Sequence, residues 1–335
     1  HQPRPRVEGA SDRTARPRSG APWARGGGIR PGHTAEVTPS VDGPLELRCA
    51  PWTLELGVDP IGSAVEIDRL VTVEVPLPWP PDIADHPWIT DLDLDAGTRM
   101  QTIVPEVART DGTVLVTRWT AVGARFTGTD WLVPAIDVPE VLALVAAGGD
   151  PDIPGEDAPD EILVCGHGAR DRCCGGSGTR LAVEARAALP EVRIRRTSHL
   201  GGHRFAPTAL SLPDGRVWAF LDVEAIAGIV DRTLHPIDAR DHYRGHVGLS
   251  PWAQVVEAVG LSEQGWAAFD VDHLEADVDV DPDGTSATVT LRWDGATGAG
   301  ERTARVGIRR RYPVLQCGLP PEAAKKDAPE YELLD

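Results

Sequence analysis

Residues 41–147 carry short runs of apolar positions that predict a first α/β domain. Residues 71–75 form a β-branched run that predicts a strand, and a second strand is predicted over residues 112–117. A helix is predicted over residues 138–147, because Asp137 is a suitable N-cap and a proline follows in the first turn.

The apolar pattern is denser from residue 162 onward. Residues 162–164 are a short apolar run that predicts a strand entering Cys165. After a glycine-rich loop, Ser177 is expected to cap a helix that runs to about Leu189, with its apolar residues on one face. Residues 192–196 then alternate as a second strand.

Two further strands and a helix complete this segment. Apolar runs on either side of residues 213–215, Pro-Asp-Gly, predict a hairpin, and Asp222 is expected to cap a helix. The resulting order β-α-β-β-β-α is typical of a thioredoxin-like layer, so we predict such a domain over residues 162–240. Loops after the first two strands should emerge at strand ends, where open α/β sheets place their sites.

The remaining residues, 241–335, predict a helix followed by a β-meander. The helix is expected over residues 252–259. The strands are expected over residues 276–280, 287–293 and 303–308. Asp281 and Asp283 could suggest a calcium loop, but no Glu follows at the required position, so we expect an ordinary turn.

Composition sets the boundaries between these segments. Residues 1–40 are rich in Arg, Gly, Pro and Ser and predict a disordered tail. Residues 148–161 are acidic and rich in Pro and Gly, which predicts a linker between two domains.

The net charge of the chain indicates which classes of macromolecule are unsuitable as its main partner. The chain has 33 Lys and Arg against 51 Asp and Glu, a net charge of −18, which argues against nucleic acid or an anionic membrane as its main partner. No apolar run approaches the roughly 20 residues that span a bilayer, and we see no secretory signal. Five unevenly spaced cysteines do not predict a disulfide framework, so we expect a cytoplasmic protein.

The candidate chemistry lies between Cys165 and His203, which enclose three of the five cysteines and three of the ten histidines. Eight residues separate Cys165 from Cys174, and three residues separate His199 from His203. Two thiolates and two imidazoles suit either zinc or a 2Fe–2S cluster. The cysteine spacing is long for a zinc knuckle, and two loops that each give a pair would match the two irons of a cluster.

This pattern resembles the sucrase/ferredoxin-like proteins, which are thioredoxin-like ferredoxins. The likeness rests on Cys-x8-Cys followed after 24 residues by His-Leu-Gly-Gly-His, and on the neighbouring words Cys173-Cys174-Gly175, Arg204-Phe205-Ala206-Pro207 and Pro213-Asp214-Gly215-Arg216. It covers residues 45–235 approximately. The resemblance implies a 2Fe–2S cluster bound by Cys165, Cys174, His199 and His203. It favours an electron carrier with an unknown redox partner protein over an enzyme with a substrate of its own.

The imidazole ligands have consequences for the redox potential. Two neutral imidazoles in place of thiolates make the cluster less negative, so its potential should lie above the roughly −400 mV of plant-type ferredoxins. A ligating imidazole also keeps a second nitrogen that can gain or lose a proton. We therefore expect proton-coupled reduction and a pH-dependent potential.

Three alternatives stay open. A structural zinc protein would use the same four ligands without redox chemistry. A thiol redox protein would use Cys165 or the Cys173-Cys174 pair as nucleophile, but it lacks the Cys-x-x-Cys motif and leaves the histidines unexplained. A non-catalytic interaction protein with a vestigial site is the third alternative, and the intact spacing of all four candidate ligands argues against it.

Four further Cys and His residues lie near the candidate ligands or apart from them in the sequence. Cys173 is expected to be a packed thiol or a group that tunes the cluster, and His167 is expected to hydrogen-bond or pack in the loop, with ligation as the alternative. Cys49 and Cys317 are isolated in the sequence, so we expect Cys49 to be a buried or incidental thiol and Cys317 to be an incidental one.

Overall fold

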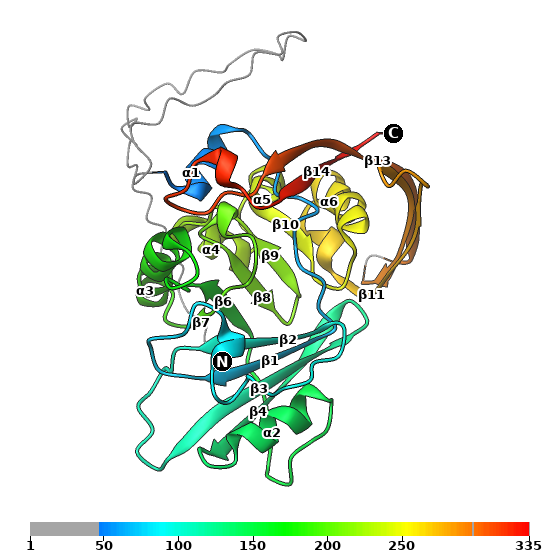
Figure 1. Cartoon of the computed structure of the whole chain (residues 1–335). Helices are drawn as coiled ribbons and strands as arrows, with labels where there is room; N and C mark the ends of the chain where they lie inside the picture. The colour runs from blue at the N-terminus through cyan, green and yellow to red at the C-terminus, as the bar shows by residue number, and fades with distance from the viewer. Residues whose placement is uncertain (1–46, 297, 335) are drawn as a thin grey trace, which may run out of the picture. The chain divides into compact units, whose positions relative to one another are not determined.

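The computed structural model describes residues 47–296 and 298–334. Within this part, the chain forms a ten-stranded mixed sheet and a four-stranded sheet, with helices packed against both (Figure 1). This agrees with the predicted α/β class. The predicted disordered tail, residues 1–40, lies outside the described residues.

The large sheet has the strand order β10-β9-β8-β6-β7-β2-β1-β3-β4-β5. Its strands are β1 (Arg69–Glu74), β2 (Thr98–Ile103), β3 (Thr113–Val122), β4 (Arg125–Pro134), β5 (Glu156–Asp157), β6 (Glu161–Cys165), β7 (Arg193–Thr197), β8 (Ala209–Leu212), β9 (Arg216–Trp218) and β10 (Tyr243–His246). The predicted strands at 71–75, 112–117, 162–164 and 192–196 overlap β1, β3, β6 and β7, and the predicted hairpin is β8–β9.

Strand β6 lies in the interior of this sheet, and all five of its residues are buried. It pairs in parallel with β7 and antiparallel with β8, which explains its unbroken apolar run. The exception is Glu161, whose carboxylate accepts hydrogen bonds from Arg195 Nε at 2.6 Å and from Trp119 Nε1 at 2.9 Å. A buried charge is thus paired within the sheet.

The two halves of the large sheet meet at a narrow junction. Strands β2 and β7 share one register pair, Ile103 with Thr197, and the Val104 amide donates to the Arg196 carbonyl beside it. A separate hydrophobic core, with members from Val71 to Ile153, belongs to the N-terminal half. The predicted linker contains β5, which pairs with β4 of the N-terminal half. The domain limits at 147 and 161 stay a prediction.

Helices cover both halves. They are α1 (Cys49–Glu55), α2 (Val138–Ala146), α3 (Thr179–Ala188), α4 (Val223–Val230), α5 (Pro236–His242) and α6 (Pro251–Gln264), with short 3-10 turns η1 (Ile83–Asp85), η3 (His203–Phe205), η4 (Gly265–Phe269) and η5 (Pro321–Ala323). Helix α2 packs on β1, β3 and β4, and α3 packs on β6 and β7. None of the described helices is long and apolar enough to cross a bilayer.

The predicted helix starts are partly right. Asp222 caps α4, and its carboxylate accepts from the Ala225 amide at 2.7 Å. Asp137 precedes α2 as expected, but its side chain makes no capping hydrogen bond. The Ser177 cap is wrong: a π-turn, η2 (Cys174–Gly178), runs directly into α3, and the Ser177 hydroxyl donates back to the Cys173 carbonyl.

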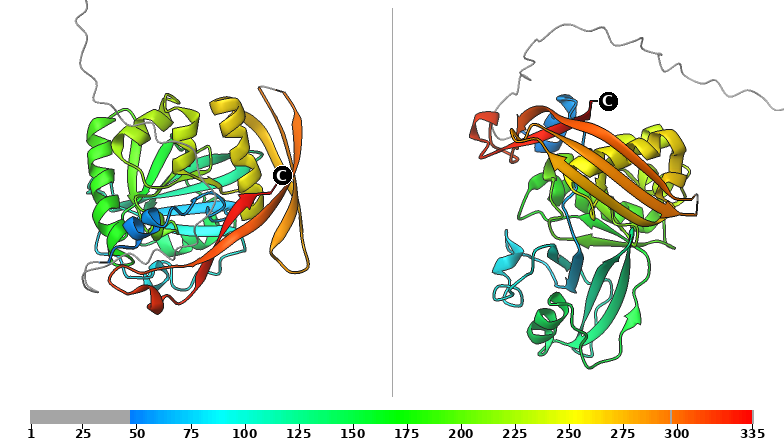
Figure 2. Two further views of the ribbon diagram at one scale, coloured as in Figure 1. Left: turned by 90° about the horizontal axis from the view of Figure 1, so that it is seen from above. Right: turned by 90° about the vertical axis from the view of Figure 1, so that its right-hand side faces the viewer.

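The C-terminal segment forms the predicted meander. Strands β11 (Val271–Val280), β12 (Ser286–Gly295), β13 (Gly300–Pro313) and β14 (Asp327–Leu333) pair antiparallel in chain order. Helix α6 packs between this sheet and β10 (Figure 2). The Asp283 carboxylate accepts from the Thr285 amide and hydroxyl, which is the hydrogen bonding of an ordinary turn.

Candidate metal centre

The candidate ligands follow the carboxyl ends of two parallel strands. Cys165 is the last residue of β6 and lies opposite Thr197, the last residue of β7. The loop after β6 carries Cys174, and the loop after β7 carries His199 and His203. Two adjacent parallel strands therefore deliver both loops to one edge of the sheet, as the sequence predicted.

A close backbone contact holds Cys174 beside Cys165. Cys174 opens the π-turn η2, a local widening that often marks functional positions in helices. At the end of this turn, a Cβ on Gly178 would lie 2.0 Å from the Cys165 carbonyl oxygen. Only glycine permits this approach, which brings the start of α3 against the end of β6.

His199 is supported by strand β2 of the N-terminal half. Its carbonyl accepts from Arg99 Nη2 at 2.8 Å and from Gln101 Nε2 at 3.2 Å. Its Nδ1 atom lies 3.9 Å from the Cys165 sulfur. The N-terminal half thus contributes to positioning a candidate ligand.

His203 follows a turn in which Gly201 and Gly202 both have positive φ. The His203 ring lies beside the His199 ring, with 5.7 Å between centroids. Its Nδ1 atom is 3.3 Å from the Asp171 carboxylate and 3.3 Å from the Cys49 sulfur. Within residues 47–296 and 298–334, these contacts involve Nδ1 alone, so Nε2 is the ring nitrogen that could ligate a metal.

The structure therefore brings together three of the four predicted ligands directly. Ligand atoms of Cys165, Cys174 and His199 all lie within 4.8 Å of one another, and both cysteines are buried. His203 is not a member of that group but lies at its side. The assignment of these four residues as metal ligands stays a prediction.

A second group of potential ligands lies next to the first. Atoms of Cys49, Asp171, Cys173 and Cys317 all lie within 4.8 Å of one another. Cys49 is buried, which is one of the two alternatives expected for it, and its sulfur lies 3.5 Å from the Cys317 sulfur across 268 sequence positions. No spacing pattern could reveal this pair, since the contact depends on how α1 and the segment after β13 pack.

The thiols of Cys165 and Cys174 titrate as a pair. A hydrogen bond from Cys174, helped by His199, holds the pKa of Cys165 well below its usual range despite burial. The same hydrogen bond and burial raise the pKa of Cys174. The pair therefore favours one thiolate, and a metal would favour the second by replacing its proton.

Hydrogen bonds, burial and neighbouring charges also shift pKa values in and beside the second group. Hydrogen bonds from Cys317 and Cys49 lower the pKa of Cys173 to about 3. Burial raises the pKa of Asp171, although His203 opposes this shift. Burial also lowers the pKa of His203, with Asp171 acting against it.

His167 occupies the packing position expected for it. Its Nε2 atom lies 2.8 Å from the Pro80 carbonyl oxygen, and its ring packs edge-on against Trp79. The Nδ1 atom is buried and has no hydrogen-bond partner among the residues that the structure describes. The contact with Pro80 accounts for the ring orientation without ligation.

A basic cavity of about 550 Å³ opens beside the two histidines. Its lining includes His199, His203 and five cations: Arg170, Arg204, Arg244, Lys325 and Lys326. No Asp or Glu is found among the described residues that line it. The chain's two lysines thus lie at this cavity, in a protein whose net charge is −18.

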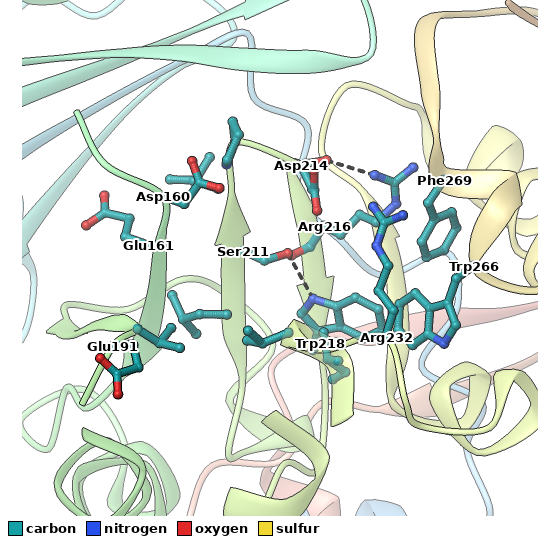
Figure 3. A pocket seen from close by; sticks show the side chains of 16 residues that line it. Asp160, Glu161, Glu191, Ser211, Asp214, Arg216, Trp218, Arg232, Trp266 and Phe269 are labelled. Carbon is teal, nitrogen blue, oxygen red and sulfur yellow. Dashed lines mark hydrogen bonds between the residues drawn. The ribbon is translucent and has the colours of Figure 1, made fainter. Parts of the chain in front are cut away.

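Another cavity, of about 270 Å³, lies at the amino ends of β6 and β7. Figure 3 shows Glu161, Glu191, Ser211 and Trp218 around it, with the Trp218 indole donating to the Ser211 hydroxyl at 3.1 Å. Ligands of open α/β sheets bind at the carboxyl ends of strands, where Cys165 and His199 lie. No cysteine or histidine lines this amino-end cavity within the described part.

The donor set at the carboxyl ends fits a metal centre. Thiolate sulfur and imidazole nitrogen are ligands of both zinc and iron–sulfur clusters. The two buried sulfurs lie on the inner side, and the partly exposed histidines line the basic cavity. This arrangement could hold a redox-active group near the surface while sulfur ligands remain shielded.

Comparison with known proteins identifies the family of the chain. The model of the sucrase/ferredoxin-like family matches residues 60–245, more than half of the chain. Two curated relatives are similar, both called altered inheritance of mitochondria protein 32. The protein from Meyerozyma guilliermondii is 36% identical over 107 residues, which are 28% of this chain and 36% of the relative.

The protein from Debaryomyces hansenii is 34% identical over 98 residues, which are 26% of this chain and 36% of the relative. The matched regions thus span about a third of each curated relative. No solved structure gives a significant match. The extent of the family match establishes that the chain belongs to the sucrase/ferredoxin-like family.

Proposed function

We propose that this protein transfers single electrons through a 2Fe–2S cluster bound by Cys165, Cys174, His199 and His203. The observation that supports it best is the convergence of two paired thiols and one imidazole within 4.8 Å, with a second imidazole alongside. When bound, the cluster would supply a one-electron redox couple.

The strand arrangement supports the thioredoxin-like part of this proposal. Strands β7, β6, β8 and β9 are neighbours in that order, with β6 and β7 parallel and the other pairs antiparallel. Helix α3 connects the parallel pair, and α4 follows β9. This is the β-α-β-β-β-α order that the sequence predicted for residues 162–240.

The two cysteines and the two histidines provide different ligand types on different sides of the site. Cys165 and Cys174 provide anionic sulfur in a buried position. Next to Cys165, Arg196 Nη2 donates a hydrogen bond to the Gly166 carbonyl at 2.7 Å. His199 and His203 provide neutral ligands next to the basic cavity. Electrons would therefore enter and leave on the histidine side, because His199 and His203 are partly exposed whereas both cysteines are buried.

The proton that accompanies reduction would reside on the histidine side. Asp171 lies 3.3 Å from His203 Nδ1 and can orient that ring and stabilise a proton on it. Such a proton would offset the charge of the added electron. The potential should therefore fall as pH rises, over the range in which Nδ1 loses its proton.

The decisive experiment is a visible absorption spectrum of the anaerobically purified full chain, with iron and acid-labile sulfide measured on the same sample. Two irons and two sulfides per chain are expected. His199→Ala and His203→Ala should each lose or markedly alter the cluster absorption. His167→Ala is the matched control, because that imidazole lies in the loop after β6, with Cys174, but contacts the Pro80 carbonyl oxygen.

Zinc at this site would contradict the proposal. A colourless protein with one zinc bound through Cys165 and Cys174, and no iron after anaerobic reconstitution, would identify a structural site instead. Loss of the absorption in His167→Ala but not in His199→Ala would reject the ligand assignment.

A further inference from the structure

The second cysteine group has the composition and geometry of a mononuclear metal site. The Cys317 sulfur lies 3.2 Å from the Cys173 sulfur and 3.5 Å from the Cys49 sulfur. The Asp171 carboxylate lies 3.3 Å from the Cys317 sulfur and 3.6 Å from the Cys49 sulfur. We propose that Cys49, Asp171, Cys173 and Cys317 bind one zinc-class divalent ion.

These separations are close to those required by tetrahedral zinc. With Zn–S bonds of about 2.3 Å and a Zn–O bond of about 2.1 Å, tetrahedral geometry places sulfurs about 3.8 Å apart and sulfur and oxygen about 3.6 Å apart. The two sulfur–sulfur distances of 3.2 and 3.5 Å are shorter than this, by about 0.6 and 0.3 Å. Small side-chain rotations would therefore open the group to receive an ion.

Burial favours a closed structural site. Cys49, Cys173 and Asp171 have exposures of 0%, 5% and 6%, and Cys317 is half-buried. Structural zinc sites use four protein ligands and leave no open position, whereas catalytic sites keep one for water. Three thiols and a carboxylate supply all four ligands here.

Backbone amides already orient the proposed ligands. The Cys173 and Cys317 amides donate to the two oxygens of Asp171 at 2.7 and 3.3 Å, and the Cys49 amide donates to the Cys317 sulfur at 3.4 Å. Amide donors of this kind stabilise anionic ligands in the protein interior. The carboxylate is thus fixed in place before an ion binds.

The ligands come from three separate parts of the chain. Cys49 begins α1, Asp171 and Cys173 lie in the loop after β6, and Cys317 follows β13. An ion would join both outer segments to the loop that carries Cys174. This second site uses none of the four proposed cluster ligands, so the two proposals can be tested separately.

The test is zinc and iron analysis of the full chain expressed with both metals and purified anaerobically. One zinc per chain is expected, in addition to the cluster iron. A Cys49→Ser/Cys317→Ser double variant should contain less than a tenth of that zinc while keeping its iron and visible absorption. A Cys165→Ser/Cys174→Ser double variant should show the reverse loss.

Cobalt gives an independent readout if a variant fails to fold. Co²⁺ added to zinc-depleted wild-type protein should produce thiolate charge-transfer and tetrahedral ligand-field bands, and zinc should abolish them. Removing zinc with a chelator should lower the thermal midpoint, and adding zinc should restore it.

Three results would overturn the second site. The first is wild-type protein without zinc whose reduced thiols give no tetrahedral cobalt bands. The second is a Cys173–Cys317 disulfide, detected by mass spectrometry, in place of bound metal. The third is zinc that persists in the Cys49→Ser/Cys317→Ser variant. Zinc in both sites without iron would instead reject the electron carrier and leave this proposal standing.

Discussion

The Nδ1 atom of His203 lies 3.3 Å from a carboxylate oxygen of Asp171, so the two neighbouring ligand groups share a contact. Asp171 raises the pKa of the His203 imidazole, while burial lowers it more strongly. The carboxylate therefore influences the range of pH in which His203 holds a second proton.

Replacing Asp171 with Asn should move the pH dependence of the reduction potential to lower pH, by about one unit, because the nearby negative charge is lost. Redox titration between pH 5 and 9 would measure this shift. Asp171→Asn would also disturb the proposed zinc site, so Cys317→Ser is the matched control, since it removes a zinc ligand and keeps the carboxylate. Identical profiles for both variants would contradict the role of Asp171.

Gly178→Ala should reduce the iron content of the purified protein by at least half. Its Cβ would lie 2.0 Å from the Cys165 carbonyl oxygen, so α3 or β6 must move and the two cysteines must separate. Gly176→Ala in the same π-turn is the control, because its Cβ would meet nothing within 4 Å. Equal iron in both variants would show that this contact does not position the cysteines.

Charge reversal at the basic cavity should slow electron exchange with anionic reagents. Lys325→Glu/Lys326→Glu is expected to reduce the rate of oxidation by ferricyanide about tenfold at low salt, and to accelerate exchange with a cationic ruthenium hexaammine couple. Stopped-flow absorption would measure both rates. Arg292→Glu/Arg302→Glu is the control, because it changes the net charge by the same amount at residues that do not line this cavity. A similar change of both rates in the control would show that the charge of the cavity does not attract the reagents locally.

Glu161→Gln should destabilise the fold by about 3 kcal/mol, because it leaves the buried Arg195 charge without its anionic partner. Urea unfolding followed by tryptophan fluorescence would measure the loss. Glu301→Gln removes an exposed ion pair with Arg292 and should cost less than about 1 kcal/mol. Equal losses would mean that the buried pair contributes no more than a surface pair.

His246 should make the protein less stable in acid. Burial lowers its pKa to about 3, whereas the unfolded chain has a histidine pKa near 6.5. Between these values the unfolded state binds more protons, so stability decreases as pH falls, by about 2 kcal/mol from pH 7 to pH 5. His246→Gln should flatten this dependence, whereas exposed His273→Gln should leave it unchanged.

The elements around Cys165 could be predicted because local sequence determines them. Strand β6 is a short buried run, and α3 has one apolar face, so their order and the loops they carry follow from the pattern. The cap at Ser177 was predicted incorrectly because a helical segment can begin earlier with a π-turn, which capping preferences do not describe.

The second cysteine group could not be predicted for a different reason. Neither Cys49 nor Cys317 has another cysteine close to it in the sequence. Their proximity results from tertiary packing around the loop after β6. The support of His199 by Arg99 also depends on the pairing of β2 with β7, which no periodicity in either strand specifies.

The distance of 268 positions between Cys49 and Cys317 has a consequence for biosynthesis. Cys165 to His203 leave the ribosome more than a hundred residues before Cys317, so their segment can begin to fold first. The three-thiol group is completed only when Cys317 emerges. Under the two proposals, the cluster ligands would thus be available for iron–sulfur assembly before the later cysteine completes the second group.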